Sequence, residues 1–433
     1  MGTTAQAMVR AVNDMADAAA ELISAVRQQG PGVIIQRIRD FDVTKVDMST
    51  VNLSLVLLLT VLMGITIMIV LANVVKEEPA PGIHKENRAL GAGSAAIEKA
   101  NAPPIPPPTE VVSLRVYPIK SCRGFEVDHT RLRKSGLTLD RNWMFVSKKD
   151  MNFMTIRTDS SMTLIDTTIT EGEPEGKEGR REQFLGISIS GTDKFIQIPA
   201  FPTPDWLKAN TTLTEVEIWE QKTDGYEYGP DINKIFCDFF NKDVALVYKG
   251  PSTRPVAVNG SKELYGKETP HHFADVMSLQ IASEASIKDL NKKLKAKDPK
   301  SEELTIERFR PNIIVKGRDD HPWEEDTWKR IRLLTVIPSE EALYKIDLDV
   351  VARCARCQVP NVNPETGKKH DKEPWTELMR YRRVDKGGVA KYKPCFGMLC
   401  LPKNDGRIVV GARLEVLETT DKHSYNEARF EDL

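Results

Sequence analysis

The chain has 433 residues, and its 61 Lys and Arg against 62 Asp and Glu give a net charge of −1. A chain of this length forms one large domain or two ordinary ones. The charge balance argues against nucleic acid as a partner, because such binding needs a basic surface. The 6 cysteines show no regular disulfide framework, which favours a reducing compartment.

The N-terminal part of the chain divides into a polar and an apolar segment. Residues 1–50 carry a polar, alanine-rich pattern that fits either a weak amphipathic helix or a loosely structured tail. Residues 53–75 contain no charged side chain. About 20 apolar residues suffice to cross a bilayer, so we predict one transmembrane helix there. Basic residues flank this segment equally on both sides, so the positive-inside rule does not set its orientation.

Residues 76–109 form a predicted linker. Charged and small residues lead to a proline-rich run, Ala102–Pro108, which favours the extended polyproline II conformation. We interpret the run as a stiff tether that holds a folded unit off a membrane. A ligand for a proline-binding module is the alternative.

After Thr109 the pattern changes to short apolar runs and period-two alternation, which predict strands. The predicted strands are Val111–Tyr117, Trp143–Ser147, Phe153–Arg157, Met162–Ile169, Leu185–Ser190, Phe195–Pro199, Glu215–Trp219, Asn312–Lys316, Arg330–Val336, Ile346–Ala352, Phe396–Leu401 and Arg413–Leu417. Helical spacing of apolar residues predicts helices at Asp231–Asn241 and Ser283–Leu294, and Glu171–Glu182 is expected to be an exposed loop. Strands dominate and the helices do not alternate with them, so we predict a β-barrel-like α+β fold and not a doubly wound parallel sheet.

The stretch Arg353-Cys354-Ala355-Arg356-Cys357 follows one predicted strand and enters a turn rich in Pro and Gly. Guanidinium groups beside a thiol favour the thiolate, which is the form that binds metals. A thiolate metal ligand is therefore predicted here.

A zinc site is the first alternative for these cysteines. Cys354 and Cys357 have half of a zinc-site spacing, and Cys395 and Cys400 could complete it. Residues an odd number apart on a strand point to opposite faces, so Cys395 and Cys400 are not expected to converge.

Several turns carry cationic or hydrogen-bonding side chains where a predicted strand begins or ends. Lys120 and Ser121 follow one strand, Arg141 precedes another, and Arg310 precedes a third. Such groups suit a phosphate, although each turn alone also fits an ordinary solvated loop. The sequence contains no glycine-rich phosphate loop.

Six motifs occur in order between residues 110 and 420. They are Tyr117–Gly124, Asp140–Trp143, Ser283–Asn291, Phe309–Asn312, Arg356–Gly367 and Phe396–Gly397. This ordered set resembles the MOSC family, which is named for the C-terminal domain of molybdenum cofactor sulfurase. Within that family it is similar to the membrane-anchored mitochondrial amidoxime-reducing components. The resemblance implies a MOSC N-terminal β-barrel domain at residues 110–245 and a MOSC β-barrel domain at residues 246–425.

The resemblance also implies a molybdenum–molybdopterin cofactor whose metal is bound by one thiolate. The family's ligand maps onto Cys357 and not onto Cys354. The residues that the resemblance assigns to the cofactor are Lys120, Ser121, Arg141, Asp275, Arg310, Asn312 and Arg356. Among these, Arg356 is expected to keep the Cys357 thiolate charged, together with Arg353.

Two positions depart from the family pattern. Asn363 stands where the family usually has Asp, which is expected to remove a carboxylate close to the metal. Val276 and Met277 follow Asp275 where the family is richer in Ser and Thr. Both departures concern substrate preference and rate, and neither removes the ligand.

The activity implied by the resemblance is reduction of N-hydroxylated compounds such as amidoximes and hydroxylamines. The chain has no haem motif such as Cys-x-x-Cys-His, so electrons are expected from cytochrome b5 and its NADH-dependent reductase. The family favours the outer mitochondrial membrane over the endoplasmic reticulum, with the folded domain facing the cytosol.

Two functions of other classes stay open. The first is a non-catalytic carrier of molybdenum cofactor or sulfur. Full sulfurases also contain a pyridoxal-phosphate domain, and residues 1–109 are too short and too apolar to form one. The second is a zinc-stabilised membrane adaptor that depends on Cys354, Cys357, Cys395 and Cys400.

Overall fold

The computed structural model describes residues 102–175, 180–256, 260–266, 268–337, 342–385 and 391–423, with the side chains of 173–175, 180 and 181 left aside. All of these residues lie in one compact unit of the chain, Ala89–Leu433. The predicted polar segment 1–50, the predicted transmembrane helix 53–75 and most of the linker lie outside the described residues. Within the described part of the chain, no helix is long and apolar enough to cross a membrane.

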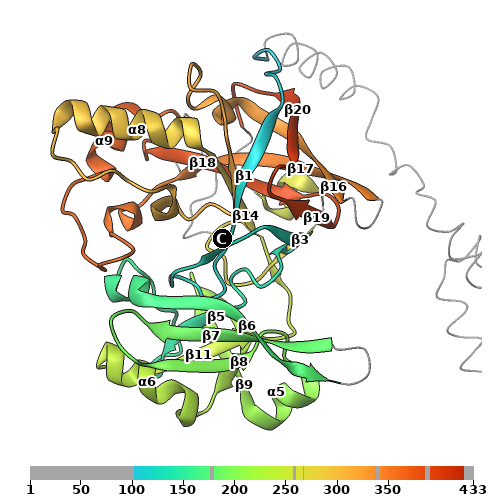
Figure 1. The fold of residues 1–433 in the computed structure, drawn as a ribbon, viewed down its shortest axis with the longest axis vertical. Coiled ribbons are helices and arrows are strands. Elements are labelled where there is room, and N and C mark those ends of the chain that lie inside the picture. The colour runs from blue at the N-terminus through green and yellow to red at the C-terminus, as the bar shows by residue number, and fades with distance from the viewer. Residues whose placement is uncertain are drawn as a thin grey trace, which may run out of the picture. The chain divides into compact units, whose positions relative to one another are not determined.

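Seven strands form a closed barrel, six of them from the C-terminal part of the chain (Figure 1). In order around the barrel they are β15 (Ile313–Val315), β14 (Leu279–Ser283), β18 (Cys395–Pro402), β17 (Ala342–Ala355), β16 (Trp328–Ile337), β20 (Arg413–Thr419) and β1 (Thr109–Val116). The additional pairing of β1 with β15 closes the ring. The predicted strand-rich barrel is confirmed for this part of the chain.

The strand β1 belongs to the C-terminal barrel although it comes first among the described elements. It pairs antiparallel with β15 through Leu114 and Ile313, and with β20 through Thr109 and Leu414. The end of β1, Leu114–Val116, also pairs antiparallel with the short strand β2 (Phe125–Val127). The chain therefore leaves the barrel after β1, forms the N-terminal layers and returns to complete the barrel.

The N-terminal layers are two antiparallel sheets, drawn in green in Figure 1. One contains β5 (Trp143–Ser147), β11 (Val244–Lys249), β10 (Gln221–Tyr228) and β9 (Thr211–Ile218), and the other contains β6 (Ile165–Glu175), β7 (Arg180–Ile189) and β8 (Phe195–Pro199). Helices α5 (Pro204–Asn210) and α6 (Pro230–Phe240) belong to this part. Among the described residues no ladder joins the two sheets into one closed barrel.

Two small sheets and three further helices complete the described fold. They are β3 (His129–Arg133) and β4 (Gly136–Leu137) with β19 (Gly406–Val409), β12 (Arg254–Pro255) with β13 (Pro270–His271), and the helices α7 (Lys262–Tyr265), α8 (Glu284–Lys297) and α9 (Trp375–Tyr381). The sheet of β3, β4 and β19 joins strands from both parts of the chain.

Helix α8 shows how the apolar spacing of the sequence becomes structure. Ser283 caps the helix by accepting a hydrogen bond from the backbone of Ser286. Leu290 and Leu294 recur at helical spacing and pack into a cluster with Phe309. The predicted helix Ser283–Leu294 is thereby confirmed.

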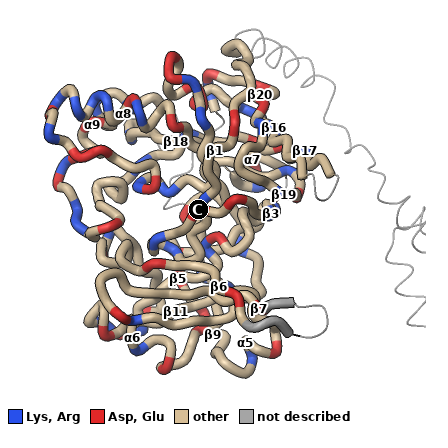
Figure 2. Tube along the Cα trace, viewed as in Figure 1, with Lys and Arg blue, Asp and Glu red and all other residues tan. Residues whose placement is uncertain are grey.

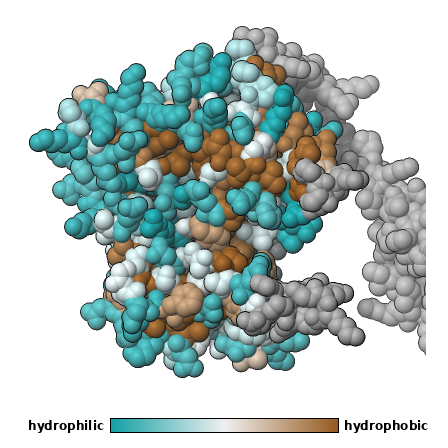
Figure 3. Space-filling view, viewed as in Figure 1, coloured by the Kyte–Doolittle hydropathy of each residue, from teal (hydrophilic) through white to brown (hydrophobic). Residues whose placement is uncertain are grey.

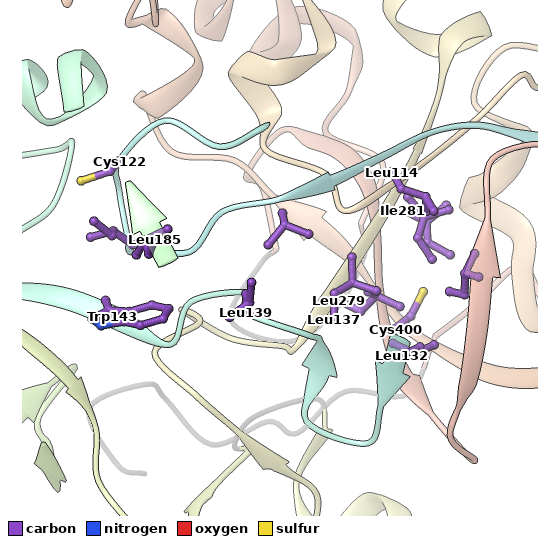
Figure 4. Packing of buried hydrophobic residues seen from close by; sticks show 14 of the residues in the cluster. Leu114, Cys122, Leu132, Leu137, Leu139, Trp143, Leu185, Leu279, Ile281 and Cys400 are labelled. Atoms are coloured by element: carbon purple, nitrogen blue, oxygen red, sulfur yellow. The ribbon is translucent and has the colours of Figure 1, made fainter. Parts of the chain in front are cut away.

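The main hydrophobic cluster runs from the barrel into the N-terminal layers (Figure 4). Leu114 and Ile281 pack in the barrel, whereas Trp143 and Leu185 pack in the sheets below. The Trp143 indole donates to the Tyr228 hydroxyl at 3.1 Å, so its buried N–H has a partner. This continuous core joins the two parts of the unit.

The surface agrees with the balanced charge of the sequence. Basic and acidic residues are interspersed along the described chain (Figure 2). Hydrophobic residues form a band across the barrel on the face that Figure 3 shows, with hydrophilic residues around it.

Three secondary-structure predictions are wrong in whole or in part. The predicted strand Met162–Ile169 is a 3-10 helix as far as Leu164 and a strand only from Ile165, where β6 begins. Residues Phe153–Arg157 do not form a strand, because Thr155 starts a turn whose carbonyl accepts from the backbone of Thr158 and Asp159. The predicted loop Glu171–Glu182 is strand at both ends, where β6 and β7 pair Glu171 with Gln183.

A candidate anion-binding site with an exposed thiol

A cavity of about 210 Å³ lies where barrel strands meet segments of the N-terminal layers. All of the residues that the sequence assigns to the site line it: Lys120, Ser121, Arg141, Asp275, Arg310, Asn312, Arg356 and Cys357. These residues come from segments far apart along the chain. The structure therefore brings the predicted set together, and the role of each residue stays a prediction.

Lys120 lies in the turn that follows β1. Its backbone N–H donates to the Trp143 carbonyl at 2.8 Å, and Ser121 beside it has a positive φ of 69°. The Lys120 ammonium donates to the Phe273 carbonyl at 3.0 Å and forms an ion pair with Asp275. Burial lowers the pKa of Lys120 to about 8, although Asp275 opposes this shift. Lys120 is thus a buried cation at the floor of the site.

Asp275 is the main anionic partner in the cavity. It accepts from the Trp219 indole at 2.9 Å and pairs with Lys120. Burial alone would raise the pKa of Asp275, but Lys120 and Arg157 outweigh that effect and hold it well below its usual range. Asp275 is therefore an ionised carboxylate that is paired with cations of the protein.

Arg141 and Arg310 lie on the ring of Tyr117. Their guanidinium carbons are 4.6 Å and 4.3 Å from its centroid. The ring also contacts Gly124, where an added Cβ would come within 2.5 Å of it. Arg141 donates to Asp140 at 2.6 Å, and Nη1 of Arg310 donates to the Cys122 carbonyl at 2.7 Å.

Arg310 keeps one N–H group without a partner. Its Nη2 is buried and has no hydrogen-bond partner among the described residues. Burial lowers the pKa of Arg310, and the neighbouring charge of Arg141 lowers it further. Two guanidinium groups on one aromatic ring, one of them with a free donor, are an arrangement that suits an anion-binding site.

Asn312 is engaged by the protein. Its side chain donates to Asp140 at 3.0 Å and accepts from the backbone of Gln280 at 3.2 Å. The Asp140 carboxylate also accepts from the backbone of Tyr117 at 2.9 Å. Asn312 and Asp140 thus tie β1 to β14 and fix the wall behind the two arginines.

Cys354 and Cys357 have different neighbours. Cys357 follows β17 and accepts from Nε of Arg157 at 3.4 Å. Cys354 accepts from Nη1 of Arg356 at 3.0 Å. Both thiols line the cavity and both are partly exposed.

Arg157 is the site residue that sequence reasoning missed. Because Phe153–Arg157 was predicted to be a strand, Arg157 was not considered as a site residue. The signal was present in the sequence, since Thr155, Thr158 and Asp159 are residues that favour turns. The turn places Arg157 at the cavity opposite Cys357.

Arg356 and Arg353 have hydrogen-bond partners other than Cys357, and their effect on its charge stays a prediction. Arg356 is buried, and it donates to Cys354 and to the Phe309 carbonyl and not to Cys357. Arg353 is buried as well and pairs with Asp385 at 3.2 Å. Among the described contacts, Arg157 provides the guanidinium for Cys357.

Asn363 does not line the cavity. Its side chain accepts from the backbone of Glu365 and Thr366 and donates to Glu302 at 2.7 Å. Its amide therefore holds the turn together, and the expectation that this position lies close to the metal is not supported.

The zinc alternative finds no support in the described residues. Cys395 and Cys400 are buried in β18, and burial raises the pKa of Cys395 to about 12 and that of Cys400 further above its usual range. Within the described ranges no group of three or more His, Cys, Asp or Glu side chains could hold a metal ion. Neither thiol lines the cavity that contains Cys354 and Cys357.

The cavity residues fit an anionic cofactor that is bound through one thiolate. Lys120, Arg141, Arg157, Arg310 and Arg356 line it, against the carboxylates of Asp275 and Asp385. The free Nη2 of Arg310 could donate to such a group. Fold and site together define a strand-rich α+β protein whose cationic cavity contains a partly exposed thiol.

Two family models match the chain in adjacent regions. The MOSC N-terminal beta barrel domain matches residues 109–243, and the MOSC domain matches residues 268–415. The chain belongs to the MOSC family, as the sequence motifs predicted.

Relatives in the curated proteins carry two kinds of name. Mitochondrial amidoxime-reducing component 1 of Mus musculus is 27% identical over 70% of this chain and 80% of its own length. Mitochondrial amidoxime reducing component 2 of Bos taurus is 27% identical over 70% of this chain and 81% of its own length. Molybdenum cofactor sulfurase of Arabidopsis thaliana is 31% identical over 66% of this chain, which spans 32% of that protein.

Proposed function

We propose that this chain is a molybdenum-cofactor-dependent reductase of N-hydroxylated compounds such as amidoximes and hydroxylamines. The observation that carries the proposal is a cavity in which cationic side chains surround the partly exposed thiol of Cys357. The names of the mouse and cattle relatives support the substrate class. The reaction breaks the N–O bond, takes up two electrons and two protons, and releases water with the reduced nitrogen compound.

Different residues of the cavity hold different parts of the cofactor in this proposal. Cys357 supplies the thiolate ligand, and Lys120, Arg141 and Arg310 bind the anionic part. Ser121 adds a hydroxyl in a left-handed turn next to Lys120. When bound, the molybdenum cofactor supplies the two-electron redox chemistry. The protein contributes position and electrostatics.

Arg356 and Asn312 act indirectly in this proposal, because they fix the parts of the protein that surround the site. Arg356 holds Cys354 and the Phe309 carbonyl, and Asn312 ties two strands of the wall together. Asp275 neutralises part of the buried charge by pairing with Lys120. These contacts keep several cations close together in one cavity.

Electrons come, in this proposal, from cytochrome b5 and its NADH-dependent reductase. The proposal takes the electron donor to be a separate protein, and the chain carries no Cys-x-x-Cys-His haem motif of its own. Residues 53–75 anchor the chain in the outer mitochondrial membrane, and the folded part faces the cytosol. The word mitochondrial in the names of the relatives supports the organelle.

A carrier of molybdenum cofactor or sulfur is the second candidate. The sulfurase relative and the presence of two thiols in one cavity favour it. A carrier passes its cargo to an acceptor, whereas the reductase retains stoichiometric molybdenum through turnover. Metal analysis before and after incubation with an apo-molybdoenzyme separates the two functions.

The deciding experiment is reduction of benzamidoxime by the purified full chain with confirmed molybdenum occupancy. Cytochrome b5, its reductase and NADH are added, and benzamidine is quantified by chromatography. The proposal predicts benzamidine that depends on every component. Benzamidoxime left unreduced by the loaded protein would overturn it.

Location is tested separately by protease treatment of intact mitochondria. A cytosol-facing domain is degraded while proteins of the intermembrane space survive. Protection of the domain until the outer membrane is ruptured would contradict the proposed orientation.

A further inference from the structure

Arg157 reaches the site from the N-terminal part of the unit. Its backbone N–H donates to Oγ1 of Thr155 at 3.0 Å, and the Thr155 carbonyl accepts from Thr158 and Asp159. These bonds fix the turn without using the Arg157 side chain. The guanidinium is therefore free to serve the cavity, which it lines together with Cys357 of the MOSC domain.

Three contacts hold the guanidinium in one place. Its carbon lies 4.6 Å from the centroid of the Trp219 ring, and Nη2 is 3.9 Å from Oδ2 of Asp275. The third contact is the donation from Nε to Sγ of Cys357 at 3.4 Å. Stacking on an aromatic face and a fixed fork of donors limit the directions in which an arginine can point its N–H groups.

The platform under Arg157 is itself anchored. The Trp219 indole donates to Asp275 at 2.9 Å, and its ring packs on Phe153 with centroids 4.8 Å apart. Asp275 in turn pairs with Lys120. A chain of contacts thus links the floor of the cavity to the group that contacts Cys357.

We propose that Arg157, held by Trp219 and Asp275, is a positioning residue. It fixes the Sγ atom of Cys357 in the direction in which this atom binds the cofactor metal. The inference deepens the proposed function, on which its metal-dependent part rests. The side chain of Arg157 is 36% exposed, so solvent screens its charge. The main contribution of Arg157 is therefore the direction of its hydrogen bond to Cys357. A positive charge without this direction does not replace the arginine.

The variants are Arg157→Ala, which removes the donor, and Arg157→Lys, which keeps the charge without the planar fork. Arg413→Ala is the matched control, since Arg413 is 60% exposed and pairs with Glu415 away from the cavity. Each variant is made in the full chain, and its melting temperature confirms folding. None of these changes removes a buried group.

The first readout needs no metal. Cofactor-free protein is labelled with N-ethylmaleimide at a pH above the thiol range, where loss of a neighbouring charge has little effect on thiolate content. Trypsin cuts after Arg353 and Arg356, so Cys354 and Cys357 fall in different peptides and are quantified separately. We expect Arg157→Ala to label several-fold faster at Cys357 only, because Sγ loses its cover and its fixed partner. Equal labelling in wild type and Arg157→Ala would overturn the inference.

The second readout is molybdenum retention during dialysis, with the electron paramagnetic resonance spectrum of the Mo(V) state. Removal of a group that orients a metal ligand typically weakens metal binding about 10-fold to 100-fold. We expect Arg157→Ala to lose molybdenum faster by about that factor and to give a broadened spectrum, with Arg413→Ala unchanged. Full rescue by Arg157→Lys would show that charge suffices and would overturn the positioning role.

The outcomes separate this inference from the proposed function. Absence of molybdenum in the wild-type chain would overturn the proposed function, and the labelling result would still decide the role of Arg157. Molybdenum retained equally by wild type and Arg157→Ala would overturn the inference alone.

Discussion

Arg356 donates from Nη1 to Sγ of Cys354 at 3.0 Å, although Cys357 is its neighbour in sequence. Arg356 lies two residues after Cys354, and side chains two residues apart on an extended chain point to the same side. Arg356 therefore turns to Cys354 and the Phe309 carbonyl, and Cys357 is left to Arg157. The two thiols of one short stretch have separate environments.

Arg356→Lys tests this arrangement. A lysine carries its three donors on a single nitrogen in place of a planar fork, so it cannot reach Cys354, Gln280 and the Phe309 carbonyl together. Leaving a buried acceptor unpaired costs about 1–3 kcal/mol, and we expect a loss of that size in the free energy of unfolding by urea titration. Cys354→Ala keeps the bond to Phe309 and should cost less. A larger loss in Cys354→Ala would contradict the account.

Tyr117 is predicted to act through its ring and not through its hydroxyl. The hydroxyl is buried without a partner among the described residues, whereas Arg141 and Arg310 both lie on the ring. Tyr117→Phe should therefore change the free energy of unfolding by less than about 0.5 kcal/mol. Tyr117→Leu loses both stacking contacts and should cost about 1–3 kcal/mol. Equal losses in the two variants would show that the hydroxyl matters.

Anion binding by the cofactor-free cavity is predicted to weaken as the pH rises through about 8. Burial lowers the pKa of Lys120 to about 8. Below that pH the ammonium is charged and attracts an anion, and above it the charge is lost. Sulfate is a suitable probe because it does not titrate in this range, and calorimetry measures its affinity. Lys120→Met should bind sulfate more weakly and with little dependence on pH. A wild-type affinity that stays constant from pH 7 to pH 9 would contradict this role.

Much of the fold and the site could be predicted from the sequence. Local apolar spacing predicted α8 and most strands, since such patterns depend on neighbouring residues. The order of short motifs predicted that Lys120, Arg141 and Cys357 would share one site, and all three line the cavity.

What could not be predicted depends on contacts between distant segments. The closure of the barrel by β1 and β15 joins residues far apart in the chain, and no local pattern encodes that pairing. Arg157 was missed because an apolar run resembled a strand, whereas the side chain of Thr155 stabilises a turn. The hydrogen bond of Arg356 to the Phe309 carbonyl likewise joins segments that are far apart in the chain.

Molybdenum content is the most direct test of the central claim that Cys357 is the metal-binding thiol. The full chain and its Cys357→Ser and Cys354→Ser variants are purified in parallel and measured by mass spectrometry of the metal. The account predicts stoichiometric molybdenum in wild type and in Cys354→Ser, and none in Cys357→Ser. Molybdenum retained by Cys357→Ser, or lost equally from both variants, would contradict it.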